Sequence, residues 1–466
     1  MSRCPHPRFR NLPALVLAAL LACPLSLIHA EEAAWKVGLA KAKITPEEPL
    51  WMAGYAARTR PAEGTLHDLW IKVLALEAPG GGRAVVVTGD LLGFPHDMAE
   101  HVCKELRQRC GLTRPQVMLT CSHSHCTPVL QGALFDCYPL EERHREAIGR
   151  YSRELEKVVI QTTVRALESL SPATLSAAEG EAGFAANRRN YGNGVVLARR
   201  AAGKPLRGPM DHRVPVLAVR SPEGRLRAVV FGYACHNTTL DSYQWCGDYA
   251  GFAQIDLEKS HPEAMAMFYI GCGADQNPLP RREVELCRQH GASLAAAVEE
   301  VLRRPMRSIR PALQTAFETL DLPFQPTPTR EWLQAEAKRS DYHGRWAKRL
   351  LGSLEAGKPL TKSAPYPVQV WRLGTDQLWI ALGGEVVVDY AIRFKADYGP
   401  TTWVAGYANE VMAYIPSARV WREGGYEAGA FDVYGLPAQG WAAGIEEKIA
   451  RSAGRLVAAL PAPPTP

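Results

Sequence analysis

A pair of histidines separated by one residue follows an apolar run. The run Gln116–Thr120 has the composition of a buried strand, and His123 and His125 come just after it. In an extended segment, residues two apart point to the same side, so both imidazoles can face one cavity. Paired neutral imidazoles suit zinc, although the same pair in an exposed loop would be merely polar. We expect the neighbouring Cys121 and Cys126 to pack or form a disulfide rather than bind metal.

Two more strand ends carry residues of the metal-binding type. His236 follows the predicted strand Leu226–Tyr233, and Glu385 follows the predicted strand Leu378–Leu382 after two glycines. Ligands in α/β proteins gather at the carboxyl ends of strands, where loops converge. For Glu385 the alternative is an acidic residue at a helix start, favoured by the helix dipole.

Two further segments hold polar groups that could serve chemistry. Asp275 and Asn277 follow another predicted strand, where the simpler interpretation is a tight turn with side-chain capping. Tyr414 and Tyr426 lie near the end of the chain, and tyrosines are more often half-buried packing groups than catalysts.

Together these segments resemble the catalytic region of neutral, non-lysosomal ceramidases. That family carries a Ser/Thr-His-x-His block, a lone histidine at a strand end, a Gly/Pro-Glu block, an Asn-x-x-x-x-Tyr block and a second tyrosine twelve residues later. In this chain, in the same order, the matching segments are Ser122–His125, Ala234–His236, Gly384-Glu385, Asn409–Tyr414 and Tyr426.

The resemblance implies a ligand set and an activity. His123, His236, Glu385 and Tyr414 would bind Zn²⁺. His125 and Tyr426 would face the scissile carbonyl, and Arg188 would contact the substrate region unless it is an ordinary surface arginine. The implied reaction is hydrolysis of an N-acyl amide, a ceramide-like lipid or related small molecule, by a zinc-activated water. A lipid substrate is compatible with peripheral membrane contact.

The chain departs from the family pattern in two places. Asn277 stands where the family has a functional serine; a carboxamide cannot be a hydroxyl nucleophile, but it can donate to an oxyanion, so Asn277 joins the catalytic candidates. We expect Asp275 beside it to orient a ligand histidine. The chain also ends about forty residues after Tyr426, so an immunoglobulin-like C-terminal domain would not fit. Both departures bear on the substrate rather than on the metal chemistry.

Apolar β-rich runs alternate with helical patterns along the chain. This alternation predicts an α/β fold, a large mixed sheet with helices packed on the sheets, in one catalytic domain over residues 31–460. Besides the three strands above, we expect strands at Ala84–Thr88, Val214–Val219, Ala266–Ile270 and Val368–Leu373. Helices are expected near Asp97–Arg109, Glu141–Leu170, Ala250–Lys259, Glu283–Arg303 and Gly444–Leu460 and after Glu385.

Both ends of the chain differ from the predicted domain. Residues 1–30 combine early arginines, an apolar run and Ala30 at the cut, which predicts a signal peptide and export to the periplasm or extracellular space. Cys23 lies in a sequence that resembles a lipoprotein cleavage box. This alternative is less favoured because Pro24 follows the cysteine. Residues 461–466 form a Pro-rich tail.

The composition excludes several other classes. Removing residues 1–30 takes away three arginines and no acids, which lowers the formal charge from +6 to +3; with no basic stripe, we expect no nucleic-acid partner. Nine of the 11 cysteines remain after cleavage, an odd number that cannot pair completely, and no Cys-x-x-Cys occurs.

Besides a metal-bearing but inactive relative, which Asn277 keeps open, three alternatives compete with the ceramidase-like interpretation. A barrel-type metal amidohydrolase also begins with His-x-His, but the later Lys, His, His and Asp strand ends are not found. A metallo-β-lactamase needs His-x-His-x-Asp-His, whereas Cys126-Thr127-Pro128 follows here. A non-catalytic exported binding protein would have polar strand caps, no metal and no response to chelators.

Overall fold

The structure, a computed structural model, describes Met1, residues 34–189 and residues 193–461. Described residues from Ala34 onward form one compact unit. The expected signal peptide, apart from Met1, and the tail beyond Pro461 lie outside the described residues.

A large mixed sheet forms the centre of this unit. Its strand order is β11-β9-β8-β6-β1-β3-β4-β5, with β13 also paired to β6. The β4–β5 and β9–β11 pairs are parallel and the others antiparallel. The strands are β1 Trp35–Lys43, β3 Trp70–Glu77, β4 Arg83–Gly89, β5 Val117–Cys121, β6 Ser171–Glu181, β8 Arg213–Arg220, β9 Leu226–Tyr233, β11 Met265–Ile270 and β13 Arg307–Ile309.

A second, four-stranded sheet packs against the first. Its order is β14-β15-β16-β18, with bounds Leu313–Pro323, Ser363–Leu373, Gln377–Leu382 and Trp403–Ala405. Trp371 and Trp379 from this sheet share one buried cluster with Leu74, Val86 and Leu217 from the large sheet. Apolar side chains on both sheets therefore pair face to face and leave the outer faces to the helices.

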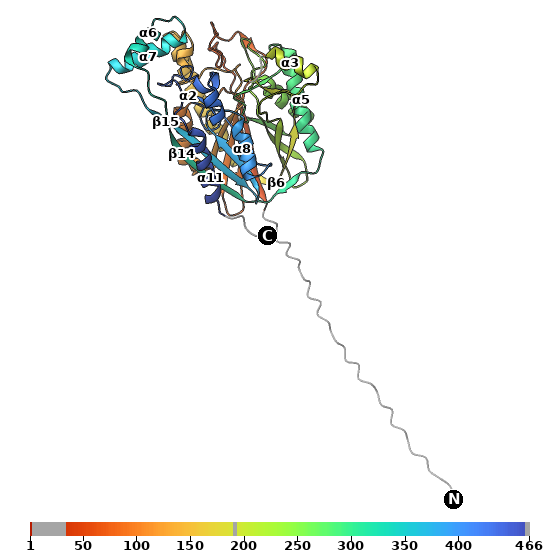
Figure 1. Cartoon of the computed structure of the whole chain (residues 1–466). Helices are drawn as coiled ribbons and strands as arrows, with labels where there is room; N and C mark the ends of the chain where they lie inside the picture. The colour runs from red at the N-terminus through yellow and green to blue at the C-terminus, as the bar shows by residue number, and fades with distance from the viewer. Residues whose placement is uncertain (2–33, 190–192, 462–466) are drawn as a thin grey trace. The chain divides into compact units, whose positions relative to one another are not determined.

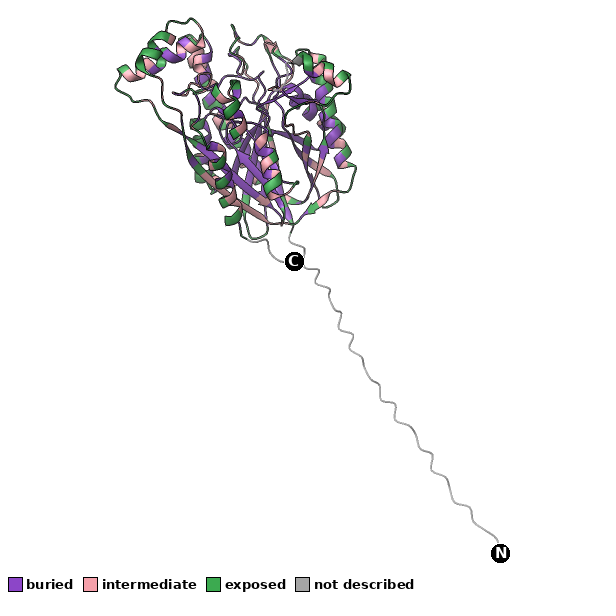
Figure 2. Cartoon of the chain, viewed as in Figure 1, coloured by how far each residue is buried: buried purple, intermediate pink, exposed green. Residues whose placement is uncertain are grey.

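Helices cover those outer faces. α2, α4 and α5 pack on the large sheet with α1 against α2, while α8 and α11 pack on the small sheet, as Figure 1 shows in part. The helices are α1 His96–Cys110, α2 Glu142–Glu168, α4 Asp248–Ser260, α5 Val284–Leu302, α8 Asp389–Tyr398 and α11 Ile445–Ala459. Burial follows these layers, with buried residues concentrated on the strands and exposed ones on the helices (Figure 2). The expected α/β fold is confirmed.

Shorter elements form the end of the unit that carries the candidate residues. Three two-stranded ribbons pair β2 with β10, β7 with β12 and β17 with β19. Their bounds are Gly64–Thr65, Gln244–Trp245, Ala185–Asn187, Gln276–Pro278, Glu385–Val386 and Tyr414–Ile415. The remaining helices are α3 Asn193–Ala201, α6 Arg330–Glu336, α7 Tyr342–Glu355, α9 Ala418–Glu423 and α10 Tyr426–Gly429, with 3₁₀ turns at Arg114–Gln116 and Phe135–Cys137.

The fold bears directly on three of the expectations drawn from the sequence. The antiparallel pairs in the large sheet rule out the barrel-type alternative, whose strands are all parallel. The nine cysteines between residues 103 and 287 are all free thiols, so the disulfides considered for an exported chain do not occur among them. Among the described residues, no helix has the length and apolar character needed to cross a bilayer.

Candidate metal centre

The loops after β5 and β9 meet because the two ends of the large sheet come into contact. β5 and β11 stand at opposite ends of the strand order, yet they contact each other. Ser124 and Asn237 form a parallel bridge between the two loops. The side-chain amide of Asn237 also donates to the Ser122 carbonyl at 2.6 Å. His123 and His236, distant in sequence, are therefore held side by side.

A short parallel ribbon places the other two candidate ligands together. Glu385 in β17 lies directly opposite Tyr414 in β19, and the Glu385 amide donates to the Ala413 carbonyl at 2.8 Å. Gly384 makes this approach possible. It has φ 71°, and a Cβ there would lie 2.7 Å from the Ala413 oxygen.

The side chains converge on one buried point. Glu385 Oε2 lies 3.0 Å from His236 Nε2 and 3.4 Å from His123 Nε2. Nε2 of His125 lies 3.2 Å from Nε2 of His123. The His236 and Tyr414 rings stack with centroids 6.4 Å apart. The structure thus brings His123, His236 and Glu385 together and places the Tyr414 ring beside His236.

The hydrogen bonds made by the Nδ1 atoms of two imidazoles indicate that a cation could bind where their Nε2 atoms meet Glu385. His123 Nδ1 is 2.6 Å from the Leu92 carbonyl, and His236 Nδ1 is 2.8 Å from the Gly273 carbonyl. A carbonyl only accepts, so each Nδ1 carries a proton, and each Nε2 is left to face the Glu385 carboxylate. A cation placed between these two nitrogens and the Glu385 carboxylate would bind to all three groups. The donor set of imidazoles and carboxylate fits Zn²⁺.

His125 belongs to the same cluster. Ligand atoms of His123, His125 and His236 all lie within 4.8 Å of one another, a grouping that can hold a metal ion. His125 is buried, and its Nδ1 has no hydrogen-bond partner among the described residues. Gly54 permits this packing, because a Cβ there would lie 2.4 Å from the His125 ring. The geometry is thus compatible with His125 as a ligand or as a group facing substrate.

Burial and mutual charge set the protonation states. Burial lowers the pKa of His236 to about 4 and, with help from His123 and His236, lowers the pKa of His125 well below its usual value. Burial also pushes the pKa of Glu385 upward, but His123 and His236 outweigh it, and the pKa falls well below the ordinary range. At neutral pH the centre therefore holds a carboxylate with neutral His125 and His236.

Tyr414 is linked to a charged network. Burial and then Glu385 raise the pKa of Tyr414 well above its usual value, so without a cation it remains a phenol. Arg188 Nη2 donates to the Tyr414 hydroxyl at 3.4 Å, and its Nε donates to Glu427 at 2.7 Å. Arg189 also pairs with Glu427. Arg188 is therefore no ordinary surface arginine, since it joins Tyr414 to a buried carboxylate.

Tyr426 lies at the outer rim of this network. Its ring is 5.2 Å from the Tyr414 ring by centroids, and the Arg188 guanidinium carbon lies 5.6 Å from its centroid. Tyr426 is 53% exposed, whereas Tyr414 is 4% exposed. A side chain at this position can meet a ligand arriving from solvent.

Asn277 lies in β12, whose backbone contacts the loop that carries His236. Its neighbour Gln276 accepts a hydrogen bond from the His236 amide at 3.0 Å. Asn277 is buried, and its Oδ1 has no partner among the described residues. This position leaves a polar atom available to a ligand or water.

The expectation for Asp275 is wrong. Its carboxylate accepts from the Val388 amide and the Asn187 side chain, both at 2.9 Å, and contacts no ligand imidazole. The Gly273 carbonyl orients His236 instead. Burial raises the pKa of Asp275 to about 6. Asp275 therefore fixes loops behind the centre.

Several contributors escaped the sequence analysis. The Tyr434 hydroxyl donates to Glu385 Oε1, and the Tyr407 ring packs 4.3 Å from the His123 ring. The Leu92 carbonyl orients His123, which itself has φ 55°, a strained conformation for a residue other than glycine. Of these contributors, only Tyr407 and Tyr434 act through side chains, which a sequence pattern could have pointed to; the Leu92 contact comes from a backbone carbonyl.

Comparisons with known proteins bear on the fold. No protein-family model matches the chain, and no curated protein matches it. A solved structure of neutral ceramidase from Pseudomonas aeruginosa superposes with a TM-score of 0.65 at 19% identity, over 86% of this chain and 71% of that chain. A structure described as ceramidase complexed with C2 gives 0.68 at 18% identity, over 93% and 77%. The chain therefore has the neutral ceramidase fold, and the resemblance drawn from its motifs is confirmed at that level.

Proposed function

We propose that this chain is a zinc-dependent hydrolase of N-acyl amides, with ceramide-like lipids as the substrate class. The observation that carries the proposal is the convergence of the Nε2 atoms of His123 and His236 on the Glu385 carboxylate, with both Nδ1 atoms held by backbone carbonyls. Tyr414 would complete the ligand set, since a cation would favour its phenolate form. The ceramidase fold supports the choice of an amide as the bond that is cut.

Zinc at this position would supply an activated water and a polarised carbonyl, because it lowers the pKa of bound water from about 15.7 toward about 7. His125 and Tyr426 would donate to the developing oxyanion, a contribution of about 3–4 kcal/mol for each donor. One of these two side chains would protonate the leaving amine. Arg188 would hold Tyr414 in place, and Asn277 would bind a polar group of the substrate.

We also infer that residues 31–460 are the catalytic domain and that the protein is exported. The supports are the compact unit from Ala34 onward and the charge, apolar run and small residue within residues 1–30. A lipid substrate would require contact with a membrane surface during catalysis. Lipoprotein attachment through Cys23 is the alternative form of export.

The test is hydrolysis of N-octanoyl sphingosine by the purified mature protein. The zinc-loaded protein should release octanoate, a chelator should abolish release, and added zinc should restore it. His123→Ala should remain folded and inactive. A folded wild type that binds no added zinc and cuts no amide would favour the non-catalytic binding protein instead.

A further inference from the structure

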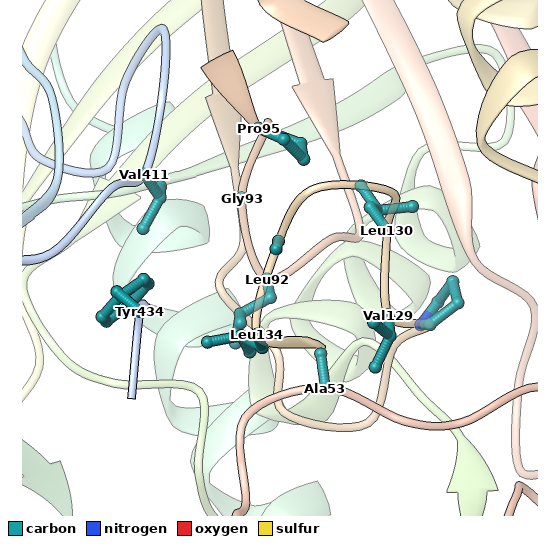
Figure 3. A pocket seen from close by; sticks show the side chains of 11 residues that line it. Ala53, Leu92, Gly93, Pro95, Val129, Leu130, Leu134, Val411 and Tyr434 are labelled. Carbon is teal, nitrogen blue, oxygen red and sulfur yellow. The ribbon is translucent and has the colours of Figure 1, made fainter. Parts of the chain in front are cut away.

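Residues from the end of α10 onward line two cavities of very different size. Figure 3 shows the smaller one, an apolar cavity whose wall includes Leu92 and Tyr434. It lies behind the metal centre, because these two residues contact His123 and Glu385. Its volume is about 20 Å³, which is room for about one water molecule and for no larger ligand.

The larger cavity lies between this segment and the hairpin formed by α6 and α7. Its volume is about 300 Å³, within the range of small-molecule sites in proteins. The hairpin is inserted between β14 and β15 and stands at the edge of the molecule in Figure 1. The cavity is also close to the rim of the metal centre, because α10 begins at the exposed Tyr426 and ends at Gly429 in the cavity wall.

Contacts between the hairpin and the segment after α10 hold the walls in place. The Trp346 indole donates to the Leu436 carbonyl at 2.9 Å. His343 pairs with Asp432, and both residues line the cavity. The walls are therefore fixed before a ligand arrives, which reduces the entropy lost on binding.

An indole ring supplies the apolar part of the lining. Trp332 lines the cavity and is 37% exposed. Its ring meets the buried Trp346 ring edge to face, with centroids 5.9 Å apart. This contact fixes the Trp332 ring and leaves part of its surface open, so a ligand with a flat face of C–H groups can pack on it.

The rest of the lining is largely polar, and its ionisable groups are already paired. Arg339 pairs with Asp341 at 2.6 Å and with Glu336 at 3.4 Å. His343 is paired with Asp432. A charged ligand would have to compete with these pairs. A neutral ligand with several hydroxyl groups can instead donate to the carboxylates and accept from the guanidinium without breaking them.

We propose that this cavity is a saccharide-binding site that takes one pyranose ring. A pyranose is neutral and has a face of C–H groups edged by hydroxyls, which matches an open indole surrounded by paired polar groups. A volume of about 300 Å³ holds one hexose, with roughly twelve heavy atoms, and a few bound waters. The site would hold the protein against a sugar-bearing surface, and it does not depend on the proposed hydrolysis.

Binding of methyl glycosides to the mature protein tests this proposal. Saturation-transfer NMR with the methyl glycosides of glucose, galactose, mannose and N-acetylglucosamine should detect at least one of them. For so small a ligand we expect a Kd on the order of millimolar. Trp332→Ala removes the indole face and should weaken binding about tenfold. Choline is the comparison ligand, because aromatic rings beside carboxylates can also hold a quaternary ammonium group.

A second variant fills the cavity without removing any side chain from it. At Gly429 the atom nearest to an added Cβ is the Gln439 carbonyl oxygen at 3.6 Å, so the position has room for a larger residue. Gly429→Leu should abolish glycoside binding. Gly352→Leu makes the same change at an exposed position of α7 outside the lining and should leave binding unchanged. Circular dichroism checks that all variants are folded.

Two further ligands distinguish a glycolipid headgroup from a free polysaccharide. Stronger binding to phosphatidylcholine vesicles that carry glucosyl diacylglycerol, which has no amide bond, would identify the headgroup. Stronger binding of soluble cellotetraose would identify the polysaccharide. Binding of choline but of none of the four glycosides would overturn the proposal. So would glycoside binding that Trp332→Ala and Gly429→Leu leave unchanged. Failure of amide hydrolysis alone would not affect it, because every readout here is binding.

Discussion

The two sides of the metal centre differ in how they hold their ligands. His123 and Glu385 are backed by an apolar cavity and fixed by two neutral contacts, from the Leu92 carbonyl and the Tyr434 hydroxyl. On the other side, Tyr414 is fixed by Arg188, whose charge is balanced by the buried Glu427. One side is neutral and enclosed, and the other is charged and reaches the surface at Tyr426.

This difference separates two tasks. Neutral contacts fix an imidazole or carboxylate without placing a charge behind it. The partly buried Arg188 would stabilise a phenolate at Tyr414, and the buried Glu427 carboxylate beside it balances the charge of the arginine. Variants that act on one side alone can therefore tell the tasks apart.

The largest effect is expected from Tyr414→Phe on the charged side. Loss of a ligand should weaken zinc binding at least ~100-fold, more than the usual effect of removing a residue that merely supports a ligand. Tyr366→Phe is the matched control, because the Tyr366 hydroxyl is buried without a hydrogen-bond partner among the described residues. Competition titration with a zinc chelator measures both. Equal affinities in the two variants would remove Tyr414 from the ligand set.

Arg188→Met tests the ion pair behind Tyr414. Removing one partner of a buried pair should lower the free energy of unfolding by about 3 kcal/mol, at the low end of the usual range because Arg189 still pairs with Glu427. Urea denaturation of the zinc-free protein measures this. Arg339→Met breaks a pair with Asp341 whose side chains are 46% and 43% exposed, and it should leave the free energy of unfolding nearly unchanged. Similar costs would mean that the Arg188 pair is not special.

Acid should destabilise the zinc-free protein through its buried imidazoles. The unfolded His236 binds a proton below pH ~6.5, while the folded one resists until about pH 4. Between these values the unfolded state binds more protons, so the free energy of unfolding should fall as pH falls, by about 3 kcal/mol from this residue alone. Urea denaturation at a series of pH values should show a shallower slope for His236→Gln. An unchanged slope would contradict the assigned protonation state.

Tyr434→Phe probes the neutral side and should have the smallest effect. It removes one hydrogen bond to Glu385 and should weaken zinc binding about tenfold, at the lower end of what such supporting residues contribute. Fold and cavity shape should persist because the ring remains. A zinc affinity loss as large as that of Tyr414→Phe would erase the proposed contrast between the two sides.

The sequence predicted much of this arrangement because the ends of buried strands can be recognised where apolar runs stop. β4, β5, β9, β11 and β16 are apolar runs, and three of them lead directly to His123, His236 and Glu385. Parallel pairing of β4 with β5 and of β9 with β11 aligns carboxyl ends, as the strand-end argument assumed. Local pattern and tertiary position agree here.

Other features depend on pairings that no local pattern records. The approach of β5 to β11 and the packing of two sheets on each other are long-range. Tyr434 and Glu427 lie in a segment of short helices and turns without periodicity, and the Leu92 and Gly273 contacts come from backbone carbonyls. Asp275 was misassigned because a carboxylate near a strand end was expected to face the centre, whereas the Val388 backbone amide and the Asn187 side chain bind it.

The central claim is that His123, His236, Glu385 and Tyr414 form a zinc site. The most direct test is the metal content and zinc affinity of the purified mature protein beside Glu385→Ala, with circular dichroism to confirm that both are folded. The account predicts one zinc per chain in the wild type and none retained in the variant. A folded wild type that binds no zinc, or a variant that binds it equally well, would contradict the account.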